Sequence, residues 1–423
     1  MADETKTTGA EESNTEELVG KDVAPPLAGD SAKTVEAPET KKADGEASAS
    51  QVVGGNWTRP NGPSPEDDVV LEAWRNEGKL HVMEGVWCQV PYKVTVVPSE
   101  SLASDSEASK KKAEGLCEAV IKEAKETFSH FEEDSEVSKI NRLAADVVHE
   151  PSYAMMKVLG MVATLNRATR GVFDPAILPL AECYKKDGGK GVEEVAGFSK
   201  WSAFRLDGKG LQKTHSGAKL DLCGLAKGWA IDEMAQRLKD GGFSSTFVDW
   251  GGDIKVTGMH PAGRNWTAGV VEPPAEEAIG QPLPEGDAKQ YIAHIELRDG
   301  QSIATSGDYL QTLASGLSHV IDPKRGAPVK ITGDSCASVS VVCSSCMLAD
   351  ALATAAMASG TVKDARKMLD MFRGASFKDP LMDYLLYSRW GPRVVRFIEP
   401  TMEKPEHRED RMARHEDAHV IVV

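Results

Sequence analysis

The chain has 423 residues, of which 41% are hydrophobic, and a formal net charge of −16 at pH 7. This length and apolar content allow one large or two ordinary domains with a substantial core. The acidic balance argues against general binding of nucleic acid, whose phosphates attract basic surfaces, and no apolar run approaches the roughly 20 residues that a membrane helix needs.

The N-terminal residues and the cysteines indicate the compartment. Met1 to Lys6 lack the apolar core of a signal peptide, and no cysteine is placed for lipid attachment. The seven cysteines, an odd number scattered over a long chain, are typical of free thiols in a reducing compartment rather than of a disulfide scaffold. We therefore expect a cytoplasmic or organelle-matrix protein.

Composition divides the chain into three parts. Residues 1–66 are rich in Glu, Thr, Ala, Ser, Lys and Pro and hold few large apolar side chains. They cannot bury enough surface to offset chain entropy, so we predict a disordered acidic leader. Residues 67–400 carry periodic apolar patterns and are predicted to form one large domain. Residues 401–423 are charged again and are predicted to be a C-terminal tail.

Apolar periodicity predicts the elements of the first half. Alternation over Leu80–Val97 predicts a strand. Helices are expected at 108–130 and 153–169, with a short helix ending near Leu143 between them. Phe173-Asp-Pro175 breaks the helical pattern, because the residue before a proline is pushed out of the helical region. Residues 198–222 are predicted to be short strands joined by Asp-Gly and Ser-Gly turns.

The stretch from Asp221 to Asp232 organises the middle of the chain. Gly224 and Gly228 flank Leu225-Ala-Lys227, and apolar residues then recur at helical spacing. A strand, a glycine turn and a helix N-terminus with a lysine form an anion cradle, because free N–H groups and the helix dipole point at the ligand. The Walker spacing is absent, and such a stretch alone is more often a plain helix start than a phosphate site.

Strands dominate the second half. They are expected at 245–248, 254–257, 266–271, 291–297, 302–305, 318–321, 336–343 and 384–388. Helices are expected at 348–359 and 361–373. Because consecutive strands outnumber βαβ units, we predict an α+β fold of mostly antiparallel sheets packed with helices.

Asp350 and Thr354 are the clearest candidate metal ligands. Residues four apart share one face of a helix, so the carboxylate and the hydroxyl project together. Oxygen ligands of this kind suit Mg²⁺, which often shares its site with phosphates. Alternatively, Asp350 is an exposed first-turn carboxylate that interacts only with the helix dipole.

Three further stretches hold candidate polar groups. Ile303-Ala-Thr-Ser-Gly-Asp-Tyr309 and Gly251-Gly-Asp253 suit close approach of the backbone to a ligand, or ordinary turns. His319, on a predicted strand beside Asp322, has either an acid–base role or a structural one. Cys343-Ser-Ser-Cys346 lacks the second cysteine pair of a zinc site, so we do not expect a metal there.

The order of these motifs resembles that of the ApbE-type FAD:protein FMN transferases. The residues that carry the resemblance are Asp221-Leu-Cys-Gly-Leu-Ala-Lys-Gly-Trp-Ala, Gly251-Gly-Asp-Ile, Ala304-Thr-Ser-Gly-Asp-Tyr, His319-Val-Ile-Asp-Pro and Ala349-Asp-Ala-Leu-Ala-Thr. Phe131 to Ser138 and Phe173-Asp-Pro175 are similar to the family's two upstream motifs. The resemblance covers about residues 80–390 and implies a single T-fold-like catalytic domain.

The resemblance implies an enzyme that uses FAD and Mg²⁺ and moves FMN to a Ser or Thr of an acceptor flavoprotein, releasing AMP. It implies flavin and nucleotide contacts from Phe131, Phe173, Asp174, Asp221, Lys227, Ser306, Gly307, Asp308 and Ile321. It implies a metal held by Asp350, Thr354 and a backbone oxygen near Gly224 or Ala226. His319 would handle the proton of the acceptor hydroxyl, and Asp221 is the second candidate catalytic residue. No nucleic acid and no membrane span are expected.

The sequence departs from the family's pattern at three places. Met83-Glu-Gly-Val-Trp87 replaces the usual Met-Gly-Thr segment of the first strand, and Asp249-Trp250 stands where small or Asn residues are usual. Most bacterial relatives are exported, whereas this chain starts with an acidic leader. Two alternatives to the transferase stay open: a metal-dependent FAD pyrophosphatase that forms FMN and AMP, and an FAD-binding protein without turnover.

Overall fold

The computed structural model describes residues 57–58, 65–274, 291–309, 313, 318–372, 383–389 and 394–397. All of them belong to one compact unit, Val52–Val423. Most of the predicted leader and the whole predicted tail lie outside the described residues. The three-part division of the chain therefore stays a prediction.

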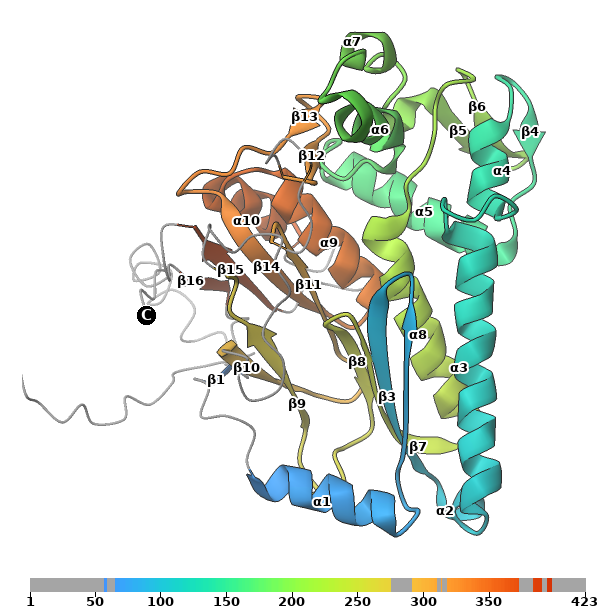
Figure 1. Ribbon diagram of the computed structural model, residues 1–423, viewed down its shortest axis with the longest axis vertical. Helices are drawn as coiled ribbons and strands as arrows, with labels where there is room; N and C mark the ends of the chain where they lie inside the picture. The colour runs from blue at the N-terminus through green and yellow to red at the C-terminus, as the bar shows by residue number, and fades with distance from the viewer. Residues whose placement is uncertain are drawn as a thin grey trace, which may run out of the picture. The chain divides into compact units, whose positions relative to one another are not determined.

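One antiparallel sheet of eight strands organises the fold (Figure 1). Its order is β16-β15-β14-β11-β8-β7-β3-β2, and every neighbouring pair is antiparallel. The strands are β2 (His81–Trp87), β3 (Val90–Pro98), β7 (Phe243–Trp250), β8 (Asp253–Thr257), β11 (Ser302–Gly307), β14 (Cys336–Cys343), β15 (Asp383–Ser388) and β16 (Val394–Phe397). The predicted α+β class with mostly antiparallel strands is confirmed.

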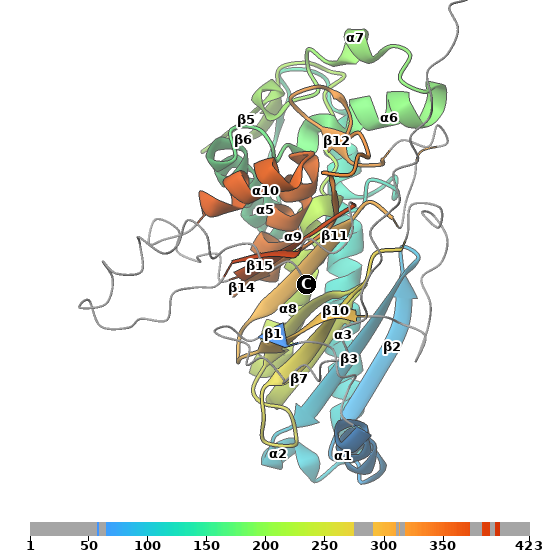
Figure 2. The same cartoon turned by 90° about the vertical axis from the view of Figure 1, so that its left-hand side faces the viewer.

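Three helices pack on one face of this sheet: α3 (Ser106–Phe128), α8 (Cys223–Asp240) and α9 (Cys346–Ala358). The helix α8 lies between the other two and also contacts β7 and β8 (Figures 1 and 2). Its buried residues recur at helical spacing, from Leu225 through Trp229 to Leu238. Alanines make up much of α9, so α8 and the sheet approach it closely and nearly all of it is buried.

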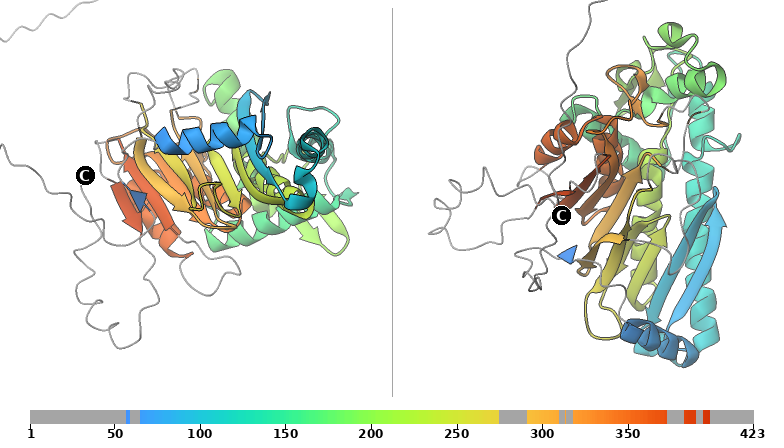
Figure 3. Two further views of the ribbon diagram at one scale, coloured as in Figure 1. Left: turned by 90° about the horizontal axis from the view of Figure 1, so that it is seen from below. Right: turned by 60° about the vertical axis from the view of Figure 1, so that its left-hand side comes forward.

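A second apolar cluster lies on the opposite face of the sheet. There β9 (Trp266–Val271) pairs with β10 (Tyr291–Leu297), which also pairs with β1 (Trp57–Thr58). Adjacent residues of a strand point to opposite faces. Accordingly Ile303 packs in this second cluster, whereas Ala304 packs in the cluster under the helices. Figure 3 shows these strands from below and from the side.

Most of the remaining elements surround the end of the sheet from which α8 starts, whereas α1 (Pro65–Asn76) and α2 (Glu100–Ala103) lie at the opposite end (Figure 1). The surrounding elements include α4 (Glu136–Arg142), α5 (Tyr153–Ala168), α6 (Leu178–Asp187), α7 (Val192–Val195), the 3₁₀ turns η1 (Pro175–Ile177) and η2 (Trp201–Ala203), and α10 (Val362–Asp370). Small sheets are formed by β4 (Val148–His149), β5 (Phe204–Asp207) and β6 (Gly210–Lys213), and by β12 (Ile321–Asp322) with β13 (Ala327–Pro328). Among the described residues, no helix is both long and apolar enough to cross a membrane.

Several local predictions were wrong. The single strand expected over Leu80–Val97 is a hairpin, in which Cys88 and Gln89 turn the chain with φ of 50° and 64°. This turn has neither glycine nor proline, so the alternation continued through it without a visible break. The helices α6 and α1 (Pro65–Asn76) were not predicted. The strand expected at 318–321 forms only from Ile321.

Candidate active site

The glycines of the central stretch lie inside a helix rather than in a turn. The residues before Cys223 form no strand, and α8 begins at Cys223, so Gly224 and Gly228 belong to its first two turns. A Cβ on Gly228 would lie 2.4 Å from the carbonyl oxygen of Cys346. Glycine is therefore needed here for the close crossing of α8 and α9.

This crossing brings Asp350 of α9 to the start of α8. Asp350 is only 5% exposed, and its Oδ2 accepts a hydrogen bond of 3.0 Å from the amide of Gly228. Asp350 is the fifth residue of α9, so the alternative of an exposed first-turn carboxylate is wrong. Burial and then the Asp253 carboxylate raise the pKa of Asp350 to about 7, against the opposing effect of Lys227.

Lys227 and Asp253 form an ion pair beside Asp350. The distance between Lys227 Nζ and Asp253 Oδ2 is 2.6 Å, and Asp253 Oδ1 accepts a hydrogen bond of 2.9 Å from the amide of Thr305. Burial opposes the charged form of Lys227, but the carboxylates of Asp253 and Asp350 outweigh it and raise the pKa of the ammonium. The α8–α9 crossing therefore holds two carboxylates and one permanent cation.

Three of the other predicted ligand positions meet at the same crossing. Ser306 Oγ of β11 lies 3.4 Å from Thr354 Oγ1 of α9. A Cβ on Gly224 would lie 3.0 Å from Cγ2 of Thr354 and 3.2 Å from its Oγ1. Ala226 lies on the same turn of α8 as Gly224, and its amide donates to the carbonyl oxygen of Leu222 at 2.9 Å. The structure thus brings Gly224, Asp350, Thr354 and Ser306 together.

Asp308 is held by a residue that the sequence analysis did not single out. It is buried and accepts hydrogen bonds from the guanidinium of Arg389, which also donates to the carbonyl oxygen of Pro274 at 2.8 Å. Burial raises the pKa of Asp308, whereas Arg389 and the nearby charge of His319 lower it. His319 therefore lies within electrostatic reach of Asp308, which ties it to the end of β11.

Packing fixes two further predicted contact residues, Gly307 and Ile321. Gly307 ends β11, and a Cβ there would lie 2.2 Å from the ring of Tyr309, so the position accepts only glycine without movement of the ring. Ile321 is buried in β12 and pairs with Pro328. Both predicted contact residues thus have a structural role.

The upstream candidates lie at different depths. Phe131 is 69% exposed, whereas Phe173 is buried in the core. Asp174 caps η1 by accepting a hydrogen bond of 2.9 Å from the amide of Ala176, and it also accepts one of 2.8 Å from the amide of Trp201. Burial raises the pKa of Asp174, whereas these hydrogen bonds lower it. Phe131 therefore offers an exposed aromatic ring, whereas Asp174 joins η1 to the start of η2.

A network that sequence reasoning missed fixes the start of α9. The carboxylate of Asp232 accepts from the amides of Cys346 and Met347 at 2.9 and 3.0 Å and from Ser345 Oγ at 2.8 Å. Lys255 Nζ lies 2.9 Å from the same carboxylate. Asp232 lies four residues after Gly228, the glycine that contacts α9. Residues four apart share one face of a helix, so this spacing was the sequence signal for a contact between Asp232 and α9.

Comparison with known sequences places this arrangement in a family. The sequence profile of the ApbE family matches residues 89–375. The chain belongs to the ApbE family. The matched range contains the α8–α9 crossing, the Lys227–Asp253 pair and His319, whereas Arg389 lies beyond it.

Individual relatives of this ApbE-family chain each cover more than half of it. The FAD:protein FMN transferase of Chlamydia pneumoniae is 28% identical over 302 residues, which are 68% of this chain and 88% of the relative. That of Vibrio cholerae is 28% identical over 254 residues, or 57% and 71%. The apo flavinyl transferase ApbE of Pseudomonas stutzeri has a TM-score of 0.61 at 24% identity, covering 76% of this chain and 95% of that one. This last likeness supports the fold.

Proposed function

We propose that this protein transfers FMN from FAD to a Ser or Thr hydroxyl of an acceptor flavoprotein, releases AMP, and needs Mg²⁺ for the transfer. The observation that carries the proposal is the convergence of Asp350, Thr354 and the Lys227 ammonium at the α8–α9 crossing. The relatives from Chlamydia pneumoniae and Vibrio cholerae described above are named FAD:protein FMN transferases, which supports the transfer itself.

The donors at the crossing fit a Mg²⁺ ion. Asp253 and Asp350 are both buried and share one ammonium, so the site is one positive charge short when both carboxylates are ionised. The missing Cβ of Gly224 leaves space beside the hydroxyl of Thr354. Asp350, Thr354 and a carbonyl oxygen of Gly224 or Ala226 are the hard oxygen donors that Mg²⁺ prefers. When bound, the ion would neutralise phosphate charge.

Lys227 and His319 supply the chemistry of the chain itself. The side chain of Lys227 is 27% exposed, so its ammonium is available to the pyrophosphate of FAD while it pairs with Asp253. His319 accepts the proton of the acceptor hydroxyl, whose oxygen bonds to the FMN phosphorus while the bond to the AMP oxygen breaks. Asp308, within electrostatic reach, stabilises the imidazolium that results.

The remaining candidates form the flavin and nucleotide contacts in this proposal. The exposed ring of Phe131 is suited to stacking on a flat aromatic ligand. Asp221, just before α8, and Ser306, beside Thr354 of α9, offer polar groups to the ligand. Phe173, Asp174, Gly307, Asp308 and Ile321 are the further contact residues in this proposal.

The experiment is covalent flavinylation. The full chain, FAD, Mg²⁺ and lysate proteins of the source cell are incubated, and a denaturing gel is inspected for fluorescent bands. We expect a band that needs Mg²⁺ and is absent with the Asp350→Asn variant. AMP and free FMN formed equally fast without any acceptor would favour the pyrophosphatase instead. FAD that stays intact for hours with Mg²⁺ would indicate a binding protein.

A further inference from the structure

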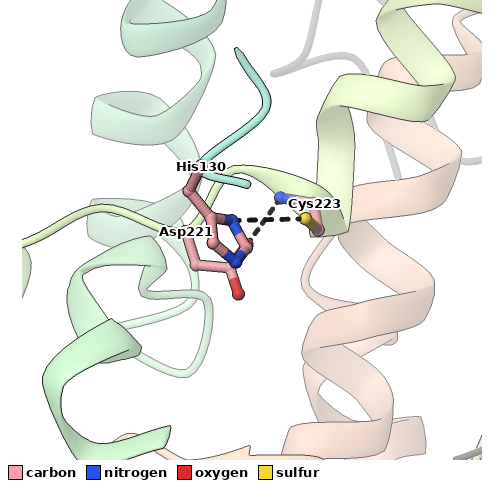
Figure 4. Close-up of side chains that lie close together, drawn as sticks. All are labelled: His130, Asp221 and Cys223. Carbon is pink, nitrogen blue, oxygen red and sulfur yellow. Dashed lines mark hydrogen bonds and ion pairs between the residues drawn. The ribbon is translucent and has the colours of Figure 1, made fainter. Parts of the chain in front are cut away.

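Three side chains with different ligand atoms lie together at the start of α8. They are His130, just after α3, and Asp221 and Cys223 (Figure 4). The distance between His130 Nδ1 and Asp221 Oδ1 is 3.6 Å, and that between His130 Nδ1 and Cys223 Sγ is 3.8 Å. One ligand atom from each residue lies within 4.8 Å of the other two.

The backbone holds these side chains in place. The amide of Asp221 donates to the carbonyl oxygen of Pro175 at 2.8 Å, and the carboxylate of Asp221 accepts from the amide of Cys223 at 2.9 Å. The ring of His130 packs against that of Phe131, with the centroids 4.0 Å apart. A cluster fixed by the fold loses little conformational freedom when an ion binds.

The spacing suits a small tetrahedral ion. Zn²⁺ binds Cys sulfur at about 2.3 Å and His nitrogen or carboxylate oxygen at about 2.0–2.2 Å, so that neighbouring ligand atoms are roughly 3.3–3.7 Å apart. The His130–Asp221 and His130–Cys223 separations given above are at or just above this range. Cys223 is exposed, and the side chains of His130 and Asp221 are 12% and 24% exposed, so an ion has access from solvent.

The ligand types distinguish this cluster from the proposed Mg²⁺ site at Asp350, where all donors are oxygen atoms. Sulfur and imidazole favour Zn²⁺ and similar ions, whereas carboxylate, hydroxyl and carbonyl oxygens favour Mg²⁺. We propose that His130 Nδ1, Asp221 and Cys223 form a second metal site that binds Zn²⁺ or a similar divalent transition metal, with a fourth position open to solvent. Binding turns the Cys223 thiol into a metal-bound thiolate, and its proton goes to the buffer.

Cobalt is the probe, because Co²⁺ occupies such sites and a bond from thiolate sulfur absorbs in the near ultraviolet. Co²⁺ is titrated into the reduced, metal-free full chain without FAD. We expect a thiolate charge-transfer band that saturates at one equivalent and disappears on addition of Zn²⁺. Cys223→Ser should abolish the band, and His130→Ala should weaken Co²⁺ binding at least tenfold.

Two variants serve as controls. Cys183→Ser changes a half-buried cysteine of α6 and should leave the band unchanged. Asp350→Asn should also leave it unchanged, so the result does not depend on flavin transfer or on the Mg²⁺ site. Circular dichroism melting checks that each variant is folded. No band in the wild type, or a band that survives in Cys223→Ser, overturns the proposal.

Discussion

Lys227 Nζ lies 2.6 Å from Asp253 Oδ2, so the first turns of α8 are joined to the first residue of β8 by an ion pair. Asp253 is 1% exposed and depends on this ammonium for its charge balance. The lysine therefore has two roles in our proposal: it compensates a buried carboxylate and it meets the phosphates of FAD.

We predict that Lys227→Met loses both stability and FAD affinity. Removing one partner of a buried pair typically costs about 3–5 kcal/mol, because the other charge stays buried without compensation. Because the side chain of Lys227 is partly exposed, we expect a loss of stability at the low end of this range. Urea unfolding and equilibrium FAD binding measure the two effects.

The double variant Lys227→Met with Asp253→Asn serves as the control. It removes the orphaned charge, so most of the stability should return while FAD affinity stays low. If FAD affinity returned together with stability, Lys227 would have no contact with the phosphates.

His319 is predicted to act on the rate and not on FAD binding. A general base typically contributes roughly 10²–10⁴-fold to a rate, and its target is the acceptor hydroxyl. His319→Ala should therefore slow single-turnover FMN transfer by about this factor, while FAD affinity changes only a few-fold. A wild-type transfer rate would exclude the base, and a parallel loss of affinity and rate would indicate that the imidazole packs against the flavin.

The sequence predicted most elements but not the contacts that define the site. Apolar periodicity found α3, α5, α8 and nearly every strand of the large sheet, because burial on one face leaves a regular pattern. The pairing of Asp308 with Arg389 joins residues 81 apart in the chain, and no local pattern encodes it. Gly224 and Gly228 suggested a turn, since a sequence does not show that a second helix passes over them.

Asp350 illustrates the same limit. The sequence correctly placed Asp350 and Thr354 on one face of a helix. The burial of Asp350, however, arises from its contact with α8, which lies more than a hundred residues away in the chain. The sequence motifs therefore indicated which residues meet, and the structure supplied the carboxylate pair and the single ammonium that make a cation favourable there.

His81 gives the fold a pH dependence. Its side chain is 5% exposed, and its Nε2 lies 2.5 Å from Ser109 Oγ. Burial, and then Lys110, lower the pKa of His81 below 6.5, although Glu107 and Glu114 oppose the shift. The unfolded chain therefore binds the proton more readily, so stability is full above pH 6.5 and falls as the pH decreases toward the folded pKa.

The measurement is urea unfolding at a series of pH values from 7.5 to about 5. We expect His81→Gln to have a flatter profile than the wild type below pH 6.5. His215→Gln, which changes an exposed histidine, should retain the wild-type profile. Equal slopes for the wild type and His81→Gln would show that other groups cause the dependence.

The last prediction separates the metal from the fold at Asp350. Asp350→Asn keeps an acceptor for the Gly228 amide and removes a negative charge that burial and Asp253 both oppose. Without Mg²⁺, the melting temperature of the variant should therefore equal or exceed that of the wild type, while FMN transfer is abolished. Mg²⁺ at about 100 times its dissociation constant stabilises a protein by about 2.7 kcal/mol, so it should raise the melting temperature of the wild type and leave that of Asp350→Asn unchanged. If Mg²⁺ stabilised both proteins equally, the ion would bind elsewhere, and if the variant unfolded, the carboxylate would have a structural role.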